Sequence, residues 1–462
     1  MTIDWIPTLK SRDVPLYLAI TKAIADDVST GKLPPDSRLP THRELADTLK
    51  MAIGTITRAY IEAEKRGLIR SEGRRGTFVG ESRRRRPALS KMIDSQSHTI
   101  NLSHNHPNFG DDPDLASALK RYARRSDIQK LLQYPPSAGH LRHREAGVKW
   151  FGDLGLSVSP ESVIVTAGAQ HALIVIFGAI AENNDIVLTD QYCYPGMKAA
   201  AGMFGLQLLG VPMDDEGMLP DELESLCKQK NVRAIYLNPT LQNPTSIVYS
   251  ASRRRQLAEL AVKYDFLIVE DELLRPLVEN PPPFISSFAP DHCFPIMSSS
   301  KTIAAGLRVG FLASPVKYRQ RLIDSLQTSM LCVSAIPAEL LAMWLEDGTA
   351  QKTIQKRQRE ITIRQQLAAA VLKKYDFTTN PASPHLWLQL PDDVTGNEFT
   401  IETYRRGVAV APAELFAIHK HSPANALRIT LANEVNRDTI KQGLEIIASI
   451  LRGTPLQDSA TV

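Results

Sequence analysis

The chain has few of the features that mark disulfide-rich, zinc-binding or membrane-spanning proteins. Its four cysteines, Cys193, Cys227, Cys293 and Cys332, are widely spaced and form no Cys-x-x-Cys pair, so neither a disulfide framework nor a zinc site is expected. The longest apolar run, Ala172–Ala181, is far shorter than the roughly 20 residues that a membrane helix needs. No basic segment followed by an apolar stretch begins the chain, so we expect no signal peptide and a cytoplasmic location.

The composition instead favours a globular protein of more than one unit. A chain of 462 residues is long for a single domain, and 43% hydrophobic with 23% charged residues is the balance of an ordinary globular protein. Residues 1–87 contain 17 Lys and Arg against 11 Asp and Glu, whereas the remainder contains 37 against 39. This asymmetry predicts an N-terminal unit that binds a polyanion, followed by a larger part with almost no net charge. A basic surface that is merely exposed to solvent would give the same composition.

The N-terminal segment has the periodicity of three short helices. Apolar residues recur at three- and four-residue intervals after Pro15, which predicts an amphipathic helix. Thr41 followed by Glu44 is a capping-box pattern and predicts a second helix over about residues 41–49. A third helix is expected over about residues 53–66. Two short helices separated by a tight turn are typical of a helix-turn-helix, whose second helix enters the major groove of DNA.

A hairpin and a linker are predicted next. Residues 67–80, GLIRSEGRRGTFVG, alternate short apolar runs around a Gly-Arg-Arg-Gly tip, which predicts a β-hairpin wing. Arginines at such a tip can reach phosphates or the minor groove. Residues 81–98 lack hydrophobic periodicity and are rich in charge, Ser and Pro, as is typical of a linker. Its four arginines, Arg83–Arg86, either add a salt-dependent grip on phosphates or keep the linker extended.

Strands alternate with helices from about residue 99. Continuous apolar strands separated by helices predict a mostly parallel sheet covered by helices on both faces, an α/β unit. Three later runs, at 385–391, 407–413 and 426–432, predict a smaller α+β subdomain. The main strands are expected in SVIVTAG (162–168), DIVLTD (185–190), AIYLNP (234–239), FLIVED (266–271), FPIMSSS (294–300) and RVGFLAS (308–314).

Polar groups follow several of these strands, where such sheets bind ligands. Residues 167–170 follow a strand and open a helix, so their backbone N–H groups suit a phosphate. Asp271 ends another strand, Lys301 follows a third, and Arg308 lies seven residues beyond the lysine. Pyridoxal 5'-phosphate (PLP) requires such a set, because a lysine forms its Schiff base, a carboxylate keeps its pyridine nitrogen protonated and a cradle anchors its phosphate.

These segments resemble known families. The stretch from Arg38 to Val79 resembles the winged helix-turn-helix of the GntR family. The motifs SSSKTIAAGLRVGF, NPTLQNPTS, AGAQHAL, IVEDE and QYCYPG resemble those of fold-type I aminotransferases. The order of the two parts is similar to the MocR subgroup of GntR regulators, over essentially the whole chain. The resemblance implies a DNA-binding domain over 1–80, a PLP-binding aminotransferase-like domain over 99–455, an operator in double-stranded DNA and a homodimer.

The resemblance also assigns roles around the cofactor. It implies that Lys301 carries PLP as a Schiff base and that Asp271 pairs with the pyridine nitrogen. Asn243 is expected to approach the ring hydroxyl, and Tyr194 to stack on the ring. The phosphate is expected to be held by Ser298, Ser300 and Arg308 with the amides of Gly168, Ala169 and Gln170.

Two further assignments concern the partner subunit and the ligand. Tyr134 corresponds to a tyrosine that reaches the phosphate of the neighbouring subunit. Arg428 stands where the family binds a substrate carboxylate through a bidentate pair. The DNA contacts implied by the GntR resemblance are Arg38, Arg43, Thr55, Thr57, Arg58, Arg74, Arg75 and Gly76.

The chain departs from the family pattern at three places. Ala52 and Ile53 replace the frequent Ser-Arg before the recognition helix, which puts one usual DNA contact in doubt. Leu273 replaces a tyrosine that donates to the ring hydroxyl, and this change is expected to alter the pKa of the Schiff base. Ala413 stands where glycine is common and is expected to reshape the substrate pocket.

Two functions fit this sequence. In the first, the protein is a transcriptional regulator in which an amine, an amino acid or PLP itself binds the large domain and alters the spacing of two DNA-binding heads. In the second, it is a working aminotransferase with an appended DNA-binding head, and Lys301 is its general acid and base. The DNA-binding module and Leu273 favour the regulator.

Overall fold

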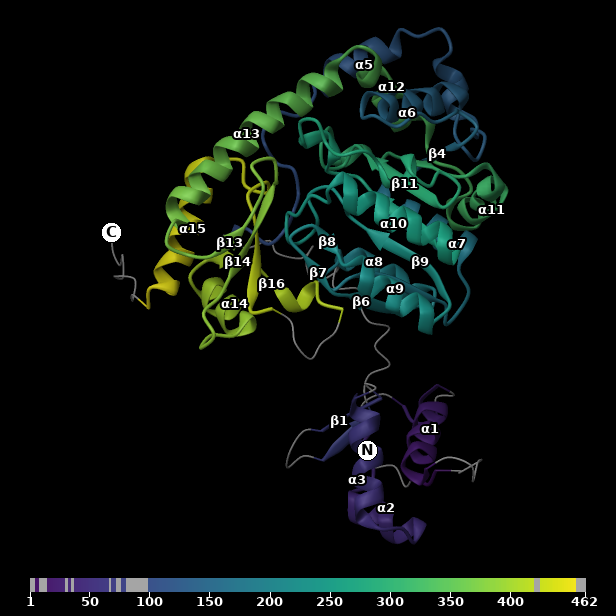
Figure 1. Cartoon of the computed structure of the whole chain (residues 1–462), viewed down its shortest axis with the longest axis vertical. Coiled ribbons are helices and arrows are strands. Elements are labelled where there is room, and N and C mark those ends of the chain that lie inside the picture. Colours follow the sequence, from purple (N-terminus) through teal and green to yellow (C-terminus); the bar gives the residue numbers. More distant parts are fainter. Residues whose placement is uncertain are drawn as a thin grey trace. The chain divides into compact units, whose positions relative to one another are not determined.

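The computed structural model describes residues 5–7, 15–29, 32–34, 37–65, 68–71, 76–79, 99–418 and 424–453. The chain divides into two compact units, Met1–Arg86 and Pro87–Val462 (Figure 1). Their boundary falls within the segment 81–98 that the sequence predicts as a linker, and this segment lies outside the described residues.

The N-terminal unit contains three helices, α1 (Leu16–Ser29), α2 (His42–Leu49) and α3 (Ile53–Lys65). The capping box is confirmed, because Thr41 N–H donates to the Glu44 carboxylate at 2.8 Å and Glu44 N–H donates to Thr41 Oγ1 at 3.3 Å. Lys50 turns the chain between α2 and α3 in a left-handed conformation. The helices bury a small apolar core formed by residues such as Ile20, Ile24, Leu45, Ile56 and Tyr60.

The predicted wing is a hairpin of β1 (Ile69–Ser71) and β2 (Thr77–Val79), which pair antiparallel. Arg38 forms an isolated antiparallel bridge to Phe78, so the segment before α2 is anchored on the hairpin. The tip residues Arg74 and Arg75 lie outside the described residues.

The second unit is built on a seven-stranded sheet with the order β4-β12-β11-β10-β9-β5-β6. Strand β12 is antiparallel to both neighbours, and the other pairings are parallel. All six strands expected from the sequence are present, and the edge strand β6 was not predicted. The strands are β4 (Val163–Thr166), β5 (Ile186–Asp190), β6 (Gln207–Val211), β9 (Val232–Leu237), β10 (Leu267–Asp271), β11 (Cys293–Ser298) and β12 (Gly310–Ala313).

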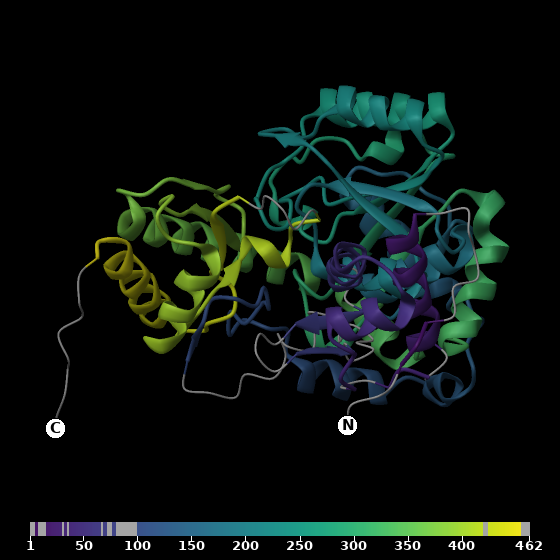
Figure 2. The ribbon, with the colours of Figure 1, turned by 90° about the horizontal axis from the view of Figure 1, so that it is seen from below.

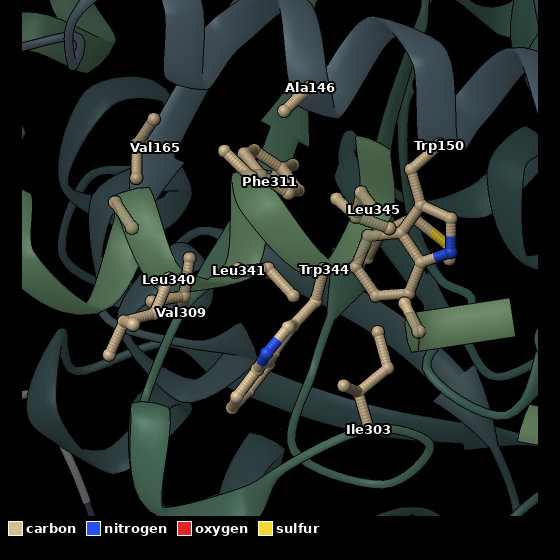
Figure 3. Close-up of a cluster of buried hydrophobic side chains, with 14 of the residues drawn as sticks. Ala146, Trp150, Val165, Ile303, Val309, Phe311, Leu340, Leu341, Trp344 and Leu345 are labelled. Carbon is tan, nitrogen blue, oxygen red and sulfur yellow. The ribbon is translucent and has the colours of Figure 1, made fainter. Parts of the chain in front are cut away.

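Helices cover both faces of this sheet, because alternate side chains of each strand are buried on opposite sides. On one face, α6 (Leu141–Asp153) and α12 (Ala335–Glu346) enclose a cluster that includes Trp150, Phe311 and Trp344 (Figure 3). The same face carries α9 (Pro220–Gln229) and α10 (Ala251–Tyr264), and α5 (Leu115–Ala123) packs against α12. The opposite face carries α7 (Ala169–Ile180), α8 (Pro195–Met203) and α11 (Arg319–Met330).

The smaller α+β part has an antiparallel sheet of order β13-β14-β17-β16. Figure 2 shows it, in green to yellow, beside the large sheet. Strand β3 (Ile100–Asn101) pairs parallel with β15 (Val408–Ala409), and β7 (Met213–Asp214) pairs with β8 (Gly217–Met218). The remaining elements are β13 (Phe377–Thr378), β14 (His385–Gln389), β16 (Ala411–Pro412), β17 (Ala426–Thr430), α13 (Thr349–Leu372), α14 (Gly396–Arg405) and α15 (Arg437–Leu451).

Among the described residues, no helix combines the length and hydrophobicity that a bilayer span requires.

Candidate functional site

A cavity of about 190 Å³ lies where β10 and β11 end, and Arg428 of β17 closes it from the smaller part. This is the edge of a parallel sheet at which ligands bind. Its wall includes eight of the residues expected at the cofactor and Leu273 beside them. The lining residues are His104, Asn105, His106, Ala169, Gln170, Tyr194, Pro195, Asn238, Thr240, Leu241, Asn243, Asp271, Leu273, Leu274, Ser300, Lys301, Arg308 and Arg428.

Lys301 follows β11 and directs its amine into this cavity. Its Nζ donates a hydrogen bond to the carbonyl of Asn105 at 2.5 Å. Burial, followed by the nearby Arg428 and Arg308 guanidinium groups, lowers the pKa of Lys301 to about 8. A buried amine whose pKa is lowered in this way keeps a substantial neutral fraction, which is the form that attacks a carbonyl.

Asp271 is the last residue of β10 and is 4% exposed. One carboxylate oxygen, Oδ2, accepts from the Tyr236 hydroxyl at 2.8 Å. The other, Oδ1, is buried and has no hydrogen-bond partner among the described residues. Burial raises the pKa of Asp271 to about 6, against the lowering effect of the Tyr236 hydroxyl. A buried carboxylate with one unsatisfied oxygen suits a protonated ring nitrogen.

The N-terminus of α7 and Arg308 form the phosphate end of the cavity. Gly168 precedes α7 with φ +84°, and a Cβ there would lie 2.8 Å from Arg308 Nη2. Arg308 Nη1 donates to Ser300 Oγ at 3.0 Å. Ser298 does not line the cavity, and its hydroxyl lies 2.9 Å from that of Ser300. The free N–H groups at the start of a helix and a guanidinium together suit a phosphate.

Tyr194 and Gln170 form the neighbouring wall. Tyr194 precedes α8, and burial raises its pKa to about 12, so the ring remains a neutral phenol. Gln170 Nε2 donates to the carbonyl of Gly196 at 3.0 Å, which leaves its Oε1 buried without a partner among the described residues. A Cβ at position 196 would lie 2.2 Å from the Tyr194 ring, so glycine is required for this packing.

Arg428 projects from β17 and joins the two parts of the unit. Its Nη1 donates to Asn243 Oδ1 at 2.9 Å, and its Nη2 donates to the carbonyl of Ser103. The guanidinium carbon lies 4.8 Å from the centre of the Phe416 ring. Burial lowers the pKa of Arg428 to about 10, which still leaves a cation at neutral pH. The acceptors that it binds among the described residues are neutral oxygens and not carboxylates.

Sequence reasoning missed several residues of the site. His104, Asn105 and His106 line the cavity, and Tyr236 holds Asp271. The signal for Tyr236 was a polar ring in the apolar second half of β9, two residues before the polar Asn238. The histidines gave no periodic signal, because they stand in a loop that the pairing of β3 with β15 brings to the site.

Two of the three departures from the family pattern lie in this unit. Leu273 lines the cavity and is half-buried, so no hydroxyl stands at that place. Ala413 does not line the cavity. It is fully buried in a cluster with Phe416 and Trp387, and the Arg428 guanidinium lies over the Phe416 ring.

Tyr134 stands apart from the cavity of its own chain and is 84% exposed. A role towards PLP therefore requires a second subunit.

The expected DNA contacts that the structure describes lie on α2, on α3 and at the base of the wing. Arg43 of α2 and Arg58 of α3 are exposed, and the Arg58 guanidinium lies 4.2 Å from the centre of the Tyr17 ring. Thr57 Oγ1 lies 3.2 Å from His42 Nδ1. Thr55 is half-buried in the first turn of α3, and Arg38 packs against Gly76.

Two family models match the chain. "Aminotransferase class I and II" matches residues 97–447, and "Bacterial regulatory proteins, gntR family" matches residues 16–79. The first spans more than half of the chain, and the second covers the helices and the hairpin described above. The chain belongs to the MocR type of GntR regulators.

The relatives of this regulator include proteins with the same two-part organisation. It is 29% identical over 453 residues to the HTH-type transcriptional regulator YdeF of Bacillus subtilis, and the alignment covers 97% of each chain. It is 28% identical to the vitamin B6 salvage pathway transcriptional repressor PtsJ of Salmonella typhimurium, over 89% of this chain and 93% of the relative. The kynurenine aminotransferase structure from Pyrococcus horikoshii matches with a TM-score of 0.73 and 26% identity, over 79% of this chain and 93% of the neighbour.

PLP is the cofactor of the large unit of this regulator. The residues present fit it: the unpartnered Asp271 Oδ1 suits the ring nitrogen, the amine of Lys301 suits the carbonyl, and Arg308 beside the N-terminus of α7 suits the phosphate. When bound, PLP would supply an aldehyde that reacts with amines and a protonated ring that withdraws electrons.

Proposed function

We propose that this MocR-type regulator senses an amine or amino acid at the Lys301 cavity and thereby changes its binding to an operator in cytoplasmic DNA. The observation that carries the proposal is the pair of cations in one cavity, Lys301 and Arg428, whose hydrogen bonds go to backbone or amide oxygens and not to a carboxylate. The oxygens that Arg428 binds are neutral, so an incoming carboxylate competes with them for its guanidinium donors.

In this proposal Lys301 holds PLP covalently, and Asp271 Oδ1 pairs with its ring nitrogen. Arg308, Ser300 and the first N–H groups of α7 hold the phosphate, while Ser298 positions Ser300. Tyr194 covers the ring as a neutral phenol. Arg428 receives a carboxylate of the effector through its two Nη atoms.

Two hydrogen bonds offer a route from the cavity towards the DNA-binding unit. Lys301 donates to Asn105 O and Arg428 donates to Ser103 O, and both carbonyls belong to the segment that follows β3. That segment in turn follows the linker 81–98 in the chain. With Lys301 bound to PLP, a ligand carboxylate that recruits Arg428 releases the Ser103 carbonyl, so the two states of the segment bind the ligand with different affinity, as regulation requires.

We further propose that the regulator is a homodimer. Tyr134 is expected to reach the neighbouring subunit's phosphate, and it stands in a loop with other exposed apolar side chains. A hydrogen bond of 2.9 Å from Gln327 Nε2 to Ser137 Oγ ties this loop to α11. A single chain leaves this surface uncovered, which supports an interface between subunits. The exposed apolar residues of this loop, of the residues that flank it and of the segment 330–336 are Leu132, Tyr134, Leu141, Met330, Leu331 and Ile336.

The direct test is the absorbance spectrum of the full chain with PLP, compared with Lys301→Ala, while amino acids and amines are added. We expect the visible band of lysine-bound PLP in the wild type and its loss in Lys301→Ala. A shift of the band with one ligand identifies the effector class. A wild type without the band refutes the role of Lys301.

An active aminotransferase is the second candidate, because the cavity brings Lys301, Asp271 and Arg428 together. Leu273, in place of a hydroxyl donor, disfavours turnover as the main task. The two functions are separated by incubating the protein with an amino acid and then a keto acid. Repeated turnover supports the enzyme, whereas a single spectral shift without turnover supports the sensor.

A further inference from the structure

His104 stands between the two cations of the cavity. The carbonyl of the residue before it, Ser103, accepts from Arg428, and the carbonyl of the residue after it, Asn105, accepts from Lys301. The His104 side chain lines the cavity and is only 8% exposed. The His104 ring is therefore placed to contact a ligand that lies between Lys301 and Arg428.

The hydrogen bonds of Asn101 assign the tautomer of His104. Asn101 Oδ1 accepts from Ser103 N–H at 3.0 Å, Ser103 Oγ at 2.9 Å and His104 N–H at 3.1 Å. The amide orientation is therefore fixed, and Asn101 Nδ2 faces His104 Nδ1 at 3.2 Å. Because Nδ2 can only donate, Nδ1 accepts and the ring proton lies on Nε2.

The Nε2–H group is left for the cavity. It lies on the ring edge away from Asn101, and it makes no hydrogen bond to the described residues. Burial, followed by the nearby Arg428 and Lys301, lowers the pKa of His104. The other ring close to it is His106, with centroids 5.3 Å apart. His104 is therefore a neutral donor at the wall of the cavity, open to a ligand that offers an acceptor.

The charges of the cavity indicate which ligand group accepts the hydrogen bond from His104 Nε2–H. Of the described residues that line the cavity, three are cationic, Lys301, Arg308 and Arg428, and one is a carboxylate, Asp271. The phosphate of PLP neutralises the Arg308 end, so the excess positive charge remains at Arg428. A carboxylate has about four lone-pair positions and a guanidinium uses two of them, so a further donor fits beside the pair.

We propose that His104 is a second carboxylate-binding residue, and that its Nε2–H and Arg428 together make the regulator selective for α-amino acids over amines without a carboxylate. The inference rests on the proposed sensing at Lys301 and narrows its ligand class. An α-amino acid carries its amine and carboxylate on one carbon, so the amine reaches the carbonyl held by Lys301 while the carboxylate reaches Arg428 and His104.

Two substitutions separate this role from a structural one. His104→Asn keeps an oxygen acceptor near the place of Nδ1 for Asn101 and removes the cavity donor. His104→Gln keeps an N–H donor near the place of Nε2. Affinities are measured on the PLP-loaded full chain from the shift of the visible band. The probes are matched pairs, L-alanine with ethylamine and L-phenylalanine with 2-phenylethylamine.

We expect the wild type to prefer each amino acid over its matched amine. His104→Asn should lower this preference about tenfold or more, because it removes a hydrogen bond to a charged group, while amine affinity stays unchanged. His104→Gln should restore part of the preference. An unchanged preference in His104→Asn, an equal loss for amine and amino acid, or a wild type that prefers amines each overturns the role of His104. A wild type with the PLP band that responds to no ligand refutes the proposed sensing, and this inference with it.

Discussion

The bond from Tyr236 to Asp271 gives the sharpest quantitative prediction. Tyr236 is fully buried at the end of β9, and its hydroxyl donates to Asp271 Oδ2 at 2.8 Å. This bond stabilises the ionised carboxylate, so Tyr236→Phe raises the pKa of Asp271 above its present value of about 6. A protonated Asp271 cannot pair with a charged ring nitrogen, and PLP binding is weakened.

The magnitude follows from the energy of one hydrogen bond. A bond to a charged group contributes about 1.5–3 kcal/mol, which corresponds to about one to two pKa units. From a starting pKa of about 6, Asp271 in the variant would titrate near pH 7–8. At pH 7 the ionised fraction falls from about nine-tenths to between about a tenth and a half, so PLP affinity falls about two- to tenfold. At pH 9 both proteins are ionised, and the difference nearly vanishes.

The assay is PLP titration of the full chain at pH 7 and pH 9. Tyr249→Phe is the matched control, because Tyr249 is another buried tyrosine that donates to a carboxylate, Asp190, outside the cavity. We expect the control to show no pH-dependent loss of PLP affinity. Equal affinity of Tyr236→Phe and wild type at pH 7, or the same loss at both pH values, would refute the reasoning.

Three further changes test other parts of the site. Gly168→Ala places a Cβ 2.8 Å from Arg308 Nη2 at a residue with positive φ, so PLP affinity should fall about tenfold in the titration. Gly152→Ala is the control, because its Cβ would meet nothing within 4 Å, and it should leave PLP affinity unchanged. Leu273→Tyr adds a donor towards the ring oxygen and should move the pH midpoint of the PLP band lower by about one unit, and an unmoved midpoint contradicts this. Arg43→Ala should weaken DNA binding about tenfold in fluorescence anisotropy while the PLP band is unchanged, and equal DNA affinity excludes Arg43 as a contact.

Much of the fold could be predicted because its helices and strands follow from patterns of residues that are close in sequence. The capping box at Thr41 and Glu44 and the apolar runs of the central strands depend on residues close in sequence. The missed strand β6 lies at the edge of the sheet and buries mainly Val211, so its hydrophobic signal is weak. Central strands are buried on both faces and give the stronger signal.

The site could be predicted only where a motif carried it. Lys301, Asp271 and Arg308 stand at strand ends or in a recognised motif, and the structure brings them into one cavity. The pattern Ser298–Ser300 could not tell which serine faces the cavity, because this depends on how the chain turns after β11. The contact of Arg428 with Asn243 spans 185 residues and depends on the packing of the smaller part against the sheet.

The loop that carries His104 shows the same limit. Its place depends on the pairing of Ile100 with Val408, which no local period records. The resemblance to aminotransferases rests on five sequence motifs, and His104 lies in none of them. The resemblance therefore gave no reason to expect His104 at the site.

The central claim is that a ligand at Lys301 controls DNA binding. The most direct measurement is the affinity of the PLP-loaded full chain for a duplex that the wild type has selected from a random pool, with and without the amino acid that shifts the PLP band. We predict that the amino acid changes the DNA affinity of the wild type at least about fivefold, the lower end of typical allosteric coupling, and leaves Lys301→Ala unchanged. A ligand that shifts the band but leaves the DNA affinity of the wild type unaltered would contradict the account.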